Sequence, residues 1–103
     1  MSKLYMVYRT DRTDGESAAI RAQTRPLHRE YMMQFGQRVR VGGPVLDANG
    51  NSCAGLMIVE ADSEAEVWDI VRNDPFEKAA LSARIEVAEF RWQTGRPADL
   101  PPL

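Results

Sequence analysis

Two short segments of this chain are apolar at both odd and even positions. They are residues 3–9 (KLYMVYR) and residues 54–60 (AGLMIVE). Because successive side chains of a strand point to opposite faces of a sheet, strands of this kind must be covered on both faces. The pattern predicts two central strands in a sheet that has a covering layer on each side.

Residues 16–37 carry a helical pattern. Pro26 lies inside the segment and predicts either a kink or the start of a second helix, because proline lacks the N–H that a helix interior uses. The spacing of three to four residues predicts one buried stripe. Its members are Ile20, Thr24, Leu27, Tyr31 and Phe35.

Residues 38–46 (RVRVGGPVL) begin with charged and apolar residues in alternation, which predicts a half-exposed strand. Gly42, Gly43 and Pro44 interrupt the alternation, as a bulge or a close backbone approach does. Residues 47–52 (DANGNS) contain Asn-Gly, a strong signal for a hairpin turn. A hairpin therefore joins this strand to the one over residues 54–60.

The second half of the chain contains two helix starts and a last strand. Ser63 and Glu66 form a capping box, and Asp74, before Pro75, is placed as the N-cap of a further helix. Residues 84–92 predict a strand whose apolar phase changes along its length, which indicates a bulge near Val87.

The resulting order, βαββαβ, predicts an α+β fold of the ferredoxin-like type with an antiparallel sheet. Residues 1–94 form the single domain, and residues 95–103 (GRPADLPPL) form a Pro-rich extended tail. Both helices cover one sheet face, so the other face exposes apolar side chains. We expect a second copy to cover it in a homodimer, the alternative being a monomer with an apolar open face.

Composition excludes several classes of protein. One cysteine and one histidine among 103 residues rule out an internal disulfide and a structural zinc site, and we expect no metal and no cofactor. A net charge of −2 gives no footprint for nucleic acid. No apolar run is long enough to span a membrane, and the N-terminus has no pattern typical of secretion, so we expect a cytoplasmic protein.

Several short motifs, in this order and spacing, resemble the YCII-related family. They are LYMVYR (4–9), RPLH (25–28), VGGP (41–44), LMIVEA (56–61) and NDPF (73–76). The resemblance implies the ferredoxin-like fold, a dimeric α/β-barrel and a His–Asp pair in a pocket, here His28 and Asp74. Members of the family include a dehydrochlorinase acting on chlorinated hydroquinones, and the family resembles muconolactone isomerases in fold.

His28 is the only source of imidazole chemistry. It lies about 60° from the centre of the predicted stripe, at the rim where a pocket between helix and sheet opens. Histidine both accepts and donates protons near neutral pH, as a general acid/base does. Asp74 is a helix N-cap whose second oxygen is free to orient an imidazole. The alternatives are a half-buried histidine with a backbone partner and a carboxylate that only caps.

Other candidate residues surround this pair. Arg25 is placed to hold a carboxylate or phenolate, although a solvated arginine is the simpler interpretation. Gly43 and Pro44 suit a pocket wall or a strand bulge, and Tyr8 and Phe76 suit aromatic walls for a planar ligand. Cys53 is better explained as a half-buried apolar residue than as a nucleophile. The absence of a nucleophile favours proton transfer, as in isomerisation or elimination.

Three functions follow from these observations. The first is a cofactor-independent lyase or isomerase acting on a small organic molecule through His28 and Asp74. The second is a non-catalytic protein of the same fold that binds a small ligand or serves an accessory role. The third is a structural dimerisation module, which predicts no concave site.

Overall fold

Four antiparallel strands form one sheet in the spatial order β2-β3-β1-β4. The computed structural model describes residues 2–100. The strands are β1 (Lys3–Asp11), β2 (Val39–Leu46), β3 (Ser52–Ala61) and β4 (Ser82–Glu89). The two strands apolar on both faces, β1 and β3, are the central ones, as predicted.

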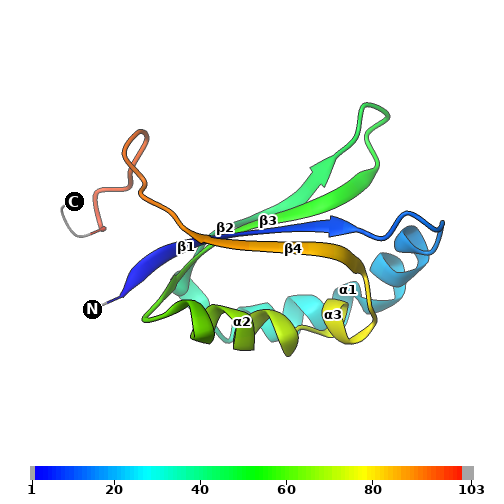
Figure 1. Cartoon of the computed structure of the whole chain (residues 1–103), viewed down its shortest axis with the longest axis horizontal. Helices are drawn as coiled ribbons and strands as arrows, with labels where there is room; N and C mark the ends of the chain where they lie inside the picture. The colour runs from blue at the N-terminus through cyan, green and yellow to red at the C-terminus, as the bar shows by residue number, and fades with distance from the viewer. Residues whose placement is uncertain (1, 101–103) are drawn as a thin grey trace.

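All three α-helices lie on one face of this sheet (Figure 1). They are α1 (Ser17–Met33), α2 (Glu64–Arg72) and α3 (Pro75–Lys78), and a 3₁₀ turn at Gly36–Arg38 leads into β2. Ser63 Oγ accepts the Glu66 N–H at 3.2 Å, and Asp74 Oδ1 accepts the Phe76 N–H at 2.9 Å. Both predicted helix starts are confirmed, and the order of elements gives the ferredoxin-like α+β fold.

The apolar core lies mainly between α2 and the two central strands. Only the C-terminal part of α1 packs against it, through Tyr31 and Met32, while Arg21 is the buried residue of the N-terminal part. The core is therefore dense under α2 and leaves room between α1 and the sheet. Its buried members include Tyr5, Val7, Met57, Val59, Val67, Ile70 and Val71.

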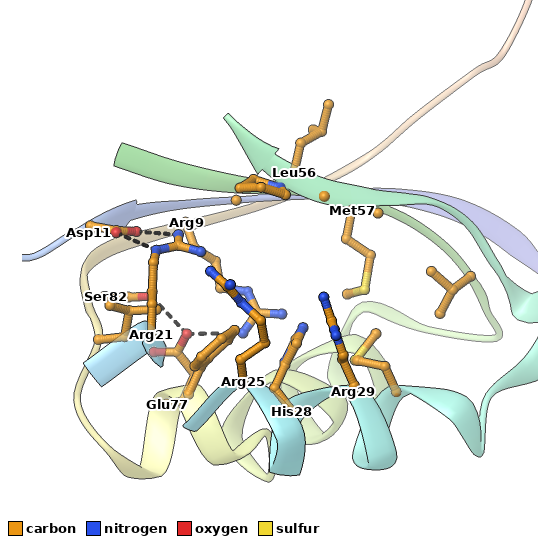
Figure 2. Close-up of a pocket in the computed structure, with 18 residues that line it drawn as sticks. Arg9, Asp11, Arg21, Arg25, His28, Arg29, Leu56, Met57, Glu77 and Ser82 are labelled. Atoms are coloured by element: carbon orange, nitrogen blue, oxygen red, sulfur yellow. Dashed lines mark hydrogen bonds and ion pairs between the residues drawn. The ribbon is translucent and has the colours of Figure 1, made fainter. Parts of the chain in front are cut away.

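Two expectations for α1 are corrected. Leu27 is 58 % exposed, whereas the side chains of Arg21, Arg25 and His28 in this part of the helix line the cavity (Figure 2). The inward face is polar because it lines a cavity rather than the core. Pro26 does not start a second helix, since α1 runs without interruption from Ser17 to Met33. Proline lacks one backbone N–H and so removes one helical hydrogen bond. The turns before and after Pro26 keep their hydrogen bonds, and the helix continues.

The bulge expected near Val87 is also corrected. Pairing between β1 and β4 is regular there, with Val7 opposite Val87, and the register shifts only between Thr10 and Asp11. The apolar phase changes because Ile85 and Val87 face the core, whereas Ala88 is on the opposite face of the sheet.

The predicted hairpin and part of the predicted tail are both described. Asp47 Oδ1 accepts the N–H groups of Asn49 and Asn51 at 2.9 and 3.0 Å, and closes the turn between β2 and β3. Residues 95–100 contain no helix or strand, yet Asp99 binds Arg40 of β2 at 2.7 Å. Residues 101–103 lie outside the described part. No helix within residues 2–100 has the length and apolar character needed to cross a membrane.

Candidate functional site

A cavity of about 660 Å³ lies between α1 and the helix-side face of the sheet. Its size falls within the range of small-molecule sites. Figure 2 shows charged side chains entering it from both the helix and the strands. The lining combines an apolar wall with eight polar or charged residues: Arg9, Asp11, Arg21, Arg25, His28, Arg29, Glu77 and Ser82.

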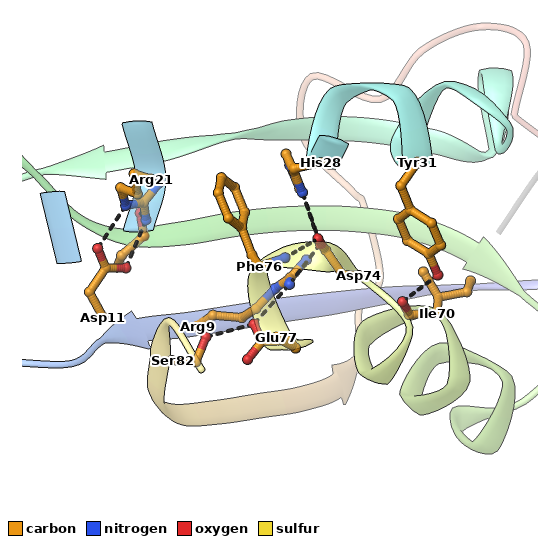
Figure 3. Close-up of polar contacts among 11 residues, drawn as sticks. Arg9, Asp11, Arg21, His28, Tyr31, Ile70, Asp74, Phe76, Glu77 and Ser82 are labelled. Carbon is orange, nitrogen blue, oxygen red and sulfur yellow. Dashed lines mark hydrogen bonds and ion pairs between the residues drawn. The ribbon is translucent and has the colours of Figure 1, made fainter. Parts of the chain in front are cut away.

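His28 and Asp74 are in contact, although 46 positions separate them. His28 Nδ1 lies 2.8 Å from Asp74 Oδ1 and 2.9 Å from Oδ2 (Figure 3). The imidazole stacks on the Phe76 ring, with centroids 4.2 Å apart and planes inclined by 24°. Both residues that hold the ring come from the start of α3. The ring lines the cavity, and within residues 2–100 its Nε2 has no hydrogen-bond partner.

Asp74 is an ionised carboxylate with no exposed surface. Burial alone raises the pKa of Asp74, but the hydrogen bond from His28 and the positive charges of Arg9 and His28 outweigh it, so the pKa lies below its ordinary value. An ionised carboxylate only accepts hydrogen bonds, so Nδ1 carries the shared proton. In the neutral form of the imidazole, the Nε2 lone pair is free towards the cavity.

Arg9 of β1 links Asp74 to a second carboxylate. Its Nη1 donates to Asp74 Oδ2 at 2.9 Å and to Glu77 Oε2 at 3.0 Å, and Ser82 Oγ donates to the same Glu77 oxygen at 2.7 Å. The sequence analysis did not identify Arg9, Glu77 or Ser82. The alternation of side chains along β1 could have identified Arg9. Tyr5 and Val7 face the helices, and Arg9 is the next residue on that face of the strand.

A second ion pair fixes the start of α1 over the sheet. Arg21 donates to both oxygens of Asp11 at 2.7 Å and to the Ala54 carbonyl at 3.1 Å, while Ser17 Oγ donates to Asp11 at 2.5 Å. Burial alone raises the pKa of Asp11, but the bonds from Arg21 and Ser17 prevail and lower it. These contacts fix the start of α1 on the sheet, although no side chain caps the backbone N–H groups of its first turn.

Arg25 and Arg29 flank His28 on α1 and point from the helix towards the sheet (Figure 2). Neither has an ion pair or a side-chain hydrogen bond to any residue in the 2–100 range. Arg25 lines the cavity and its side chain is exposed, a position that fits both a ligand contact and the solvated arginine that the sequence favours. Arg29 was not identified, although it occupies the helical position one turn beyond Arg25.

Gly43 and Pro44 line the cavity from β2, together with Gly42 and with Gly55 of β3. Pro44 and Gly55 are opposite one another in the sheet. The glycines leave the cavity open on this side, since a Cβ at Gly55, which shares the face of Met57, would meet no atom within 4 Å.

Tyr8 is not part of the cavity, which corrects its assignment as an aromatic wall. Tyr8 pairs with Leu56 on the opposite face of the sheet, and the pleat turns it away from the helices. The cavity side of β1 is formed by Arg9 and Asp11, whereas Phe76, the other proposed wall, does line the cavity. Within residues 2–100, no three His, Cys, Asp or Glu side chains are grouped so as to hold a metal ion.

These observations define a class of protein, namely a ferredoxin-like α+β domain with a His–Asp pair at a cavity between helix and sheet. The model of the YCII-related domain matches residues 3–91. The chain therefore belongs to the YCII-related family.

Similar proteins include one curated relative and several solved structures. The derivative of benzaldehyde biosynthesis cluster protein C of Emericella nidulans is 32% identical over 98 residues, covering 84% of this chain and 99% of that protein. The 5-chloro-2-hydroxyhydroquinone dehydrochlorinase of Burkholderia phenoliruptrix, in complex with 2,5-dihydroxybenzoquinone, is 35% identical, with a TM-score of 0.77, over 89% of this chain and 95% of that chain. PA3566 of Pseudomonas aeruginosa, 13% identical with a TM-score of 0.54 over 91% and 97% of the two chains, shares the fold alone.

Proposed function

We propose that this protein is a cofactor-independent lyase or isomerase that moves a proton on a small organic molecule. His28 is the general acid/base, and Asp74 orients it. One observation carries the proposal: buried Asp74 lies 2.8 Å from His28 Nδ1 while the imidazole lines a cavity of about 660 Å³. Similarity to a dehydrochlorinase over 89% of the chain supports a lyase in particular.

The contacts of the pair suit a cycle of proton transfer. Nε2 accepts a proton from the substrate, and Asp74 stabilises the imidazolium that forms. In an elimination, the electron pair of the broken bond to hydrogen forms a double bond, and the leaving group departs with its own bonding pair. In an isomerisation, Nε2 returns the proton to a different atom of the same molecule. Both reactions regenerate the neutral imidazole, the elimination after the proton passes to water.

Halide release from 5-chloro-2-hydroxyhydroquinone tests elimination, and conversion of muconolactone tests isomerisation. We expect turnover of one of them by the wild type and a loss of kcat/KM of about a thousandfold in His28→Gln. Asp74→Asn is expected to lose about a hundredfold, because the amide does not stabilise an imidazolium. Arg72→Gln, on the exposed part of α2, is the matched control, and circular dichroism checks that each variant folds.

Two outcomes would contradict this proposal. Wild-type turnover in His28→Gln would exclude His28 as the acid/base. Saturable binding without turnover across both substrate classes would instead support the non-catalytic ligand-binding alternative. The third alternative, a structural module without a concave site, is disfavoured by the cavity itself.

We also infer that a second copy of the chain covers the open face of the sheet. This face is apolar at its centre, where Met6 lies between Ile58 and Ala88. Val41 and Phe90, towards its edges, are each 37 % exposed. Apolar side chains on an uncovered sheet face are typical of an association surface, and twofold dimers are the commonest assembly.

A further inference from the structure

The cavity holds more positive than negative charge. Four arginines line it, and two of them are neutralised: Arg9 by Asp74 and Glu77, and Arg21 by Asp11. Arg25 and Arg29 are not neutralised by any residue of the 2–100 range. The whole chain carries a net charge of −2, so a general surplus of basic residues does not explain this local excess.

The arrangement on α1 adds a small repulsion between Arg25 and Arg29, which are both exposed. Arg21, Arg25 and Arg29 repeat every four residues along one helix face, and His28 lies beside them. Like charges four residues apart destabilise a helix. Neither Arg25 nor Arg29 has an acidic residue three or four positions away to offset the repulsion. A bound anion would supply the missing negative charge.

We propose that the cavity binds an organic anion whose charged group lies between Arg25 and Arg29. This inference rests on the proposed function, whose substrate class it specifies. A guanidinium matches the planar geometry of a carboxylate or of an ionised enol, so a group of this shape is the expected ligand chemistry. Met32, Met57 and Phe76, which also line the cavity, suit a compact apolar carbon skeleton attached to that group.

The position of His28 gives the anion site a chemical consequence. Its Nε2 lies between the two arginines on the same helix face, so a ligand held by them presents its neighbouring atoms to the base. When Nε2 removes a proton, the negative charge that develops on the ligand is close to two fixed guanidinium groups. Electrostatic stabilisation of this kind is among the largest contributions that a binding site makes to catalysis.

Binding of benzoate and of benzamide, which have similar shapes but different charges, tests the proposal without any turnover. Titrations followed by NMR are made on the wild type, Arg25→Gln, Arg29→Gln and the double variant. We expect the wild type to bind benzoate at least tenfold more tightly than benzamide, and increasing salt to reduce the difference. Each single variant is expected to weaken benzoate binding about five- to tenfold, and the double variant to lose the preference for the anion.

Arg72→Gln is the matched control, since it removes an arginine of α2 outside the cavity. The substitutions on α1 relieve repulsion, so their melting temperatures are expected to equal or exceed that of the wild type, which separates lost binding from lost folding. A double variant that keeps the wild-type preference, or a wild type that shows none, would overturn the anion site. A protein that binds benzoate as expected but shows no turnover contradicts only the catalytic proposal.

Discussion

At the scale of single residues, Asp74 has two roles that are usually separate. One oxygen caps α3 through the Phe76 N–H, and the other accepts from Arg9, while both lie within 2.9 Å of His28 Nδ1. The cap fixes where the carboxylate lies, and the carboxylate fixes the imidazole. Because the capping role is local, the sequence predicted it; the contact with His28 depends on how α1 lies over the sheet.

The lowered pKa of Asp74 predicts a pH dependence of stability. The unfolded chain binds a proton at this carboxyl near its ordinary value of 3.8, whereas the folded protein binds it only at lower pH. The stabilisation from ionised Asp74 is therefore fully present above about pH 5 and is lost as the pH falls through the folded pKa. Urea unfolding from pH 7 to pH 3 is expected to show a steeper loss for the wild type than for Asp74→Asn.

The pKa of Asp11 is lowered as well, but Asp11 is present in both the wild type and Asp74→Asn. Its contribution to the pH dependence of stability is therefore the same in both proteins. Parallel curves for the wild type and Asp74→Asn would contradict the assignment of the effect to Asp74.

The residues that sequence reasoning missed are those whose roles depend on tertiary contacts. Glu77 lies in the first turn of α3, a local position, but its bond with Arg9 joins positions 68 apart. Arg29 and Arg25 look alike in the sequence. Only the structure shows that the acidic side chains lining the cavity, Asp11 and Glu77, pair with Arg21 and Arg9 instead. Tyr8 was misplaced because aromatic character favours a ligand wall, whereas strand parity decides which face a side chain occupies.

At the scale of elements, α1 is held at its two ends by different forces. Tyr31, Met32 and Phe35, at and just beyond its C-terminus, pack on the apolar core, and its N-terminus is fixed by the Asp11–Arg21 pair. The predicted stripe assumed that a helix over a sheet buries apolar side chains along its whole length. The assumption holds for α2, which buries Val67, Ile70 and Val71, and fails where α1 lines a cavity.

Two similar Arg–Asp pairs allow a matched test of how α1 is held. Arg21–Asp11 is buried, whereas Arg12–Asp14, with bonds from 2.5 to 3.1 Å, is exposed. Asp11→Ala leaves a buried guanidinium unpaired and is expected to lower the free energy of unfolding by about 3 kcal/mol. Asp14→Ala is expected to change it little, because solvent screens an exposed pair. Urea denaturation at pH 7 measures both, and equal effects would contradict the proposed role of Asp11.

The glycine wall formed by β2 and β3 predicts a variant that blocks the cavity without unfolding the protein. Gly55 shares the face of Met57, which points into the cavity, and a Cβ there meets no atom within 4 Å. Gly55→Val is expected to keep or raise the melting temperature, because valine favours strands, and to weaken benzoate binding at least tenfold. Wild-type affinity in a folded Gly55→Val protein would show that the ligand occupies another part of the molecule.

At the scale of the whole molecule, the two faces of the sheet serve different purposes. The helix side holds the core and the cavity. On the open side Met6, Ile58 and Ala88 lie in one row across β3, β1 and β4, and Ile58 is already buried within the chain. The sequence predicted that both faces of the sheet are covered, because β1 and β3 are apolar on both faces. The partner on the open side is a separate question, since a single chain contains no information on its copies beyond the apolar surface itself.

Light scattering coupled to size exclusion tests the homodimer. The mass of one chain is 11.6 kDa, so a dimer has twice that value, 23.2 kDa. We expect the wild type at the dimer mass and Met6→Asp at the monomer mass, because the substitution places a charge at the centre of an apolar contact. Gln23→Asp, on the exposed side of α1, is the control and is expected to remain dimeric.

Met6 is on the face away from the cavity, so a folded Met6→Asp monomer is expected to bind benzoate with wild-type affinity. This outcome would separate assembly from ligand binding and assign the cavity to a single chain. Loss of benzoate binding in a folded monomer would mean instead that the partner contributes to the site. A wild type that remains at 11.6 kDa throughout the accessible concentration range would contradict the homodimer and leave the open face exposed in a monomer.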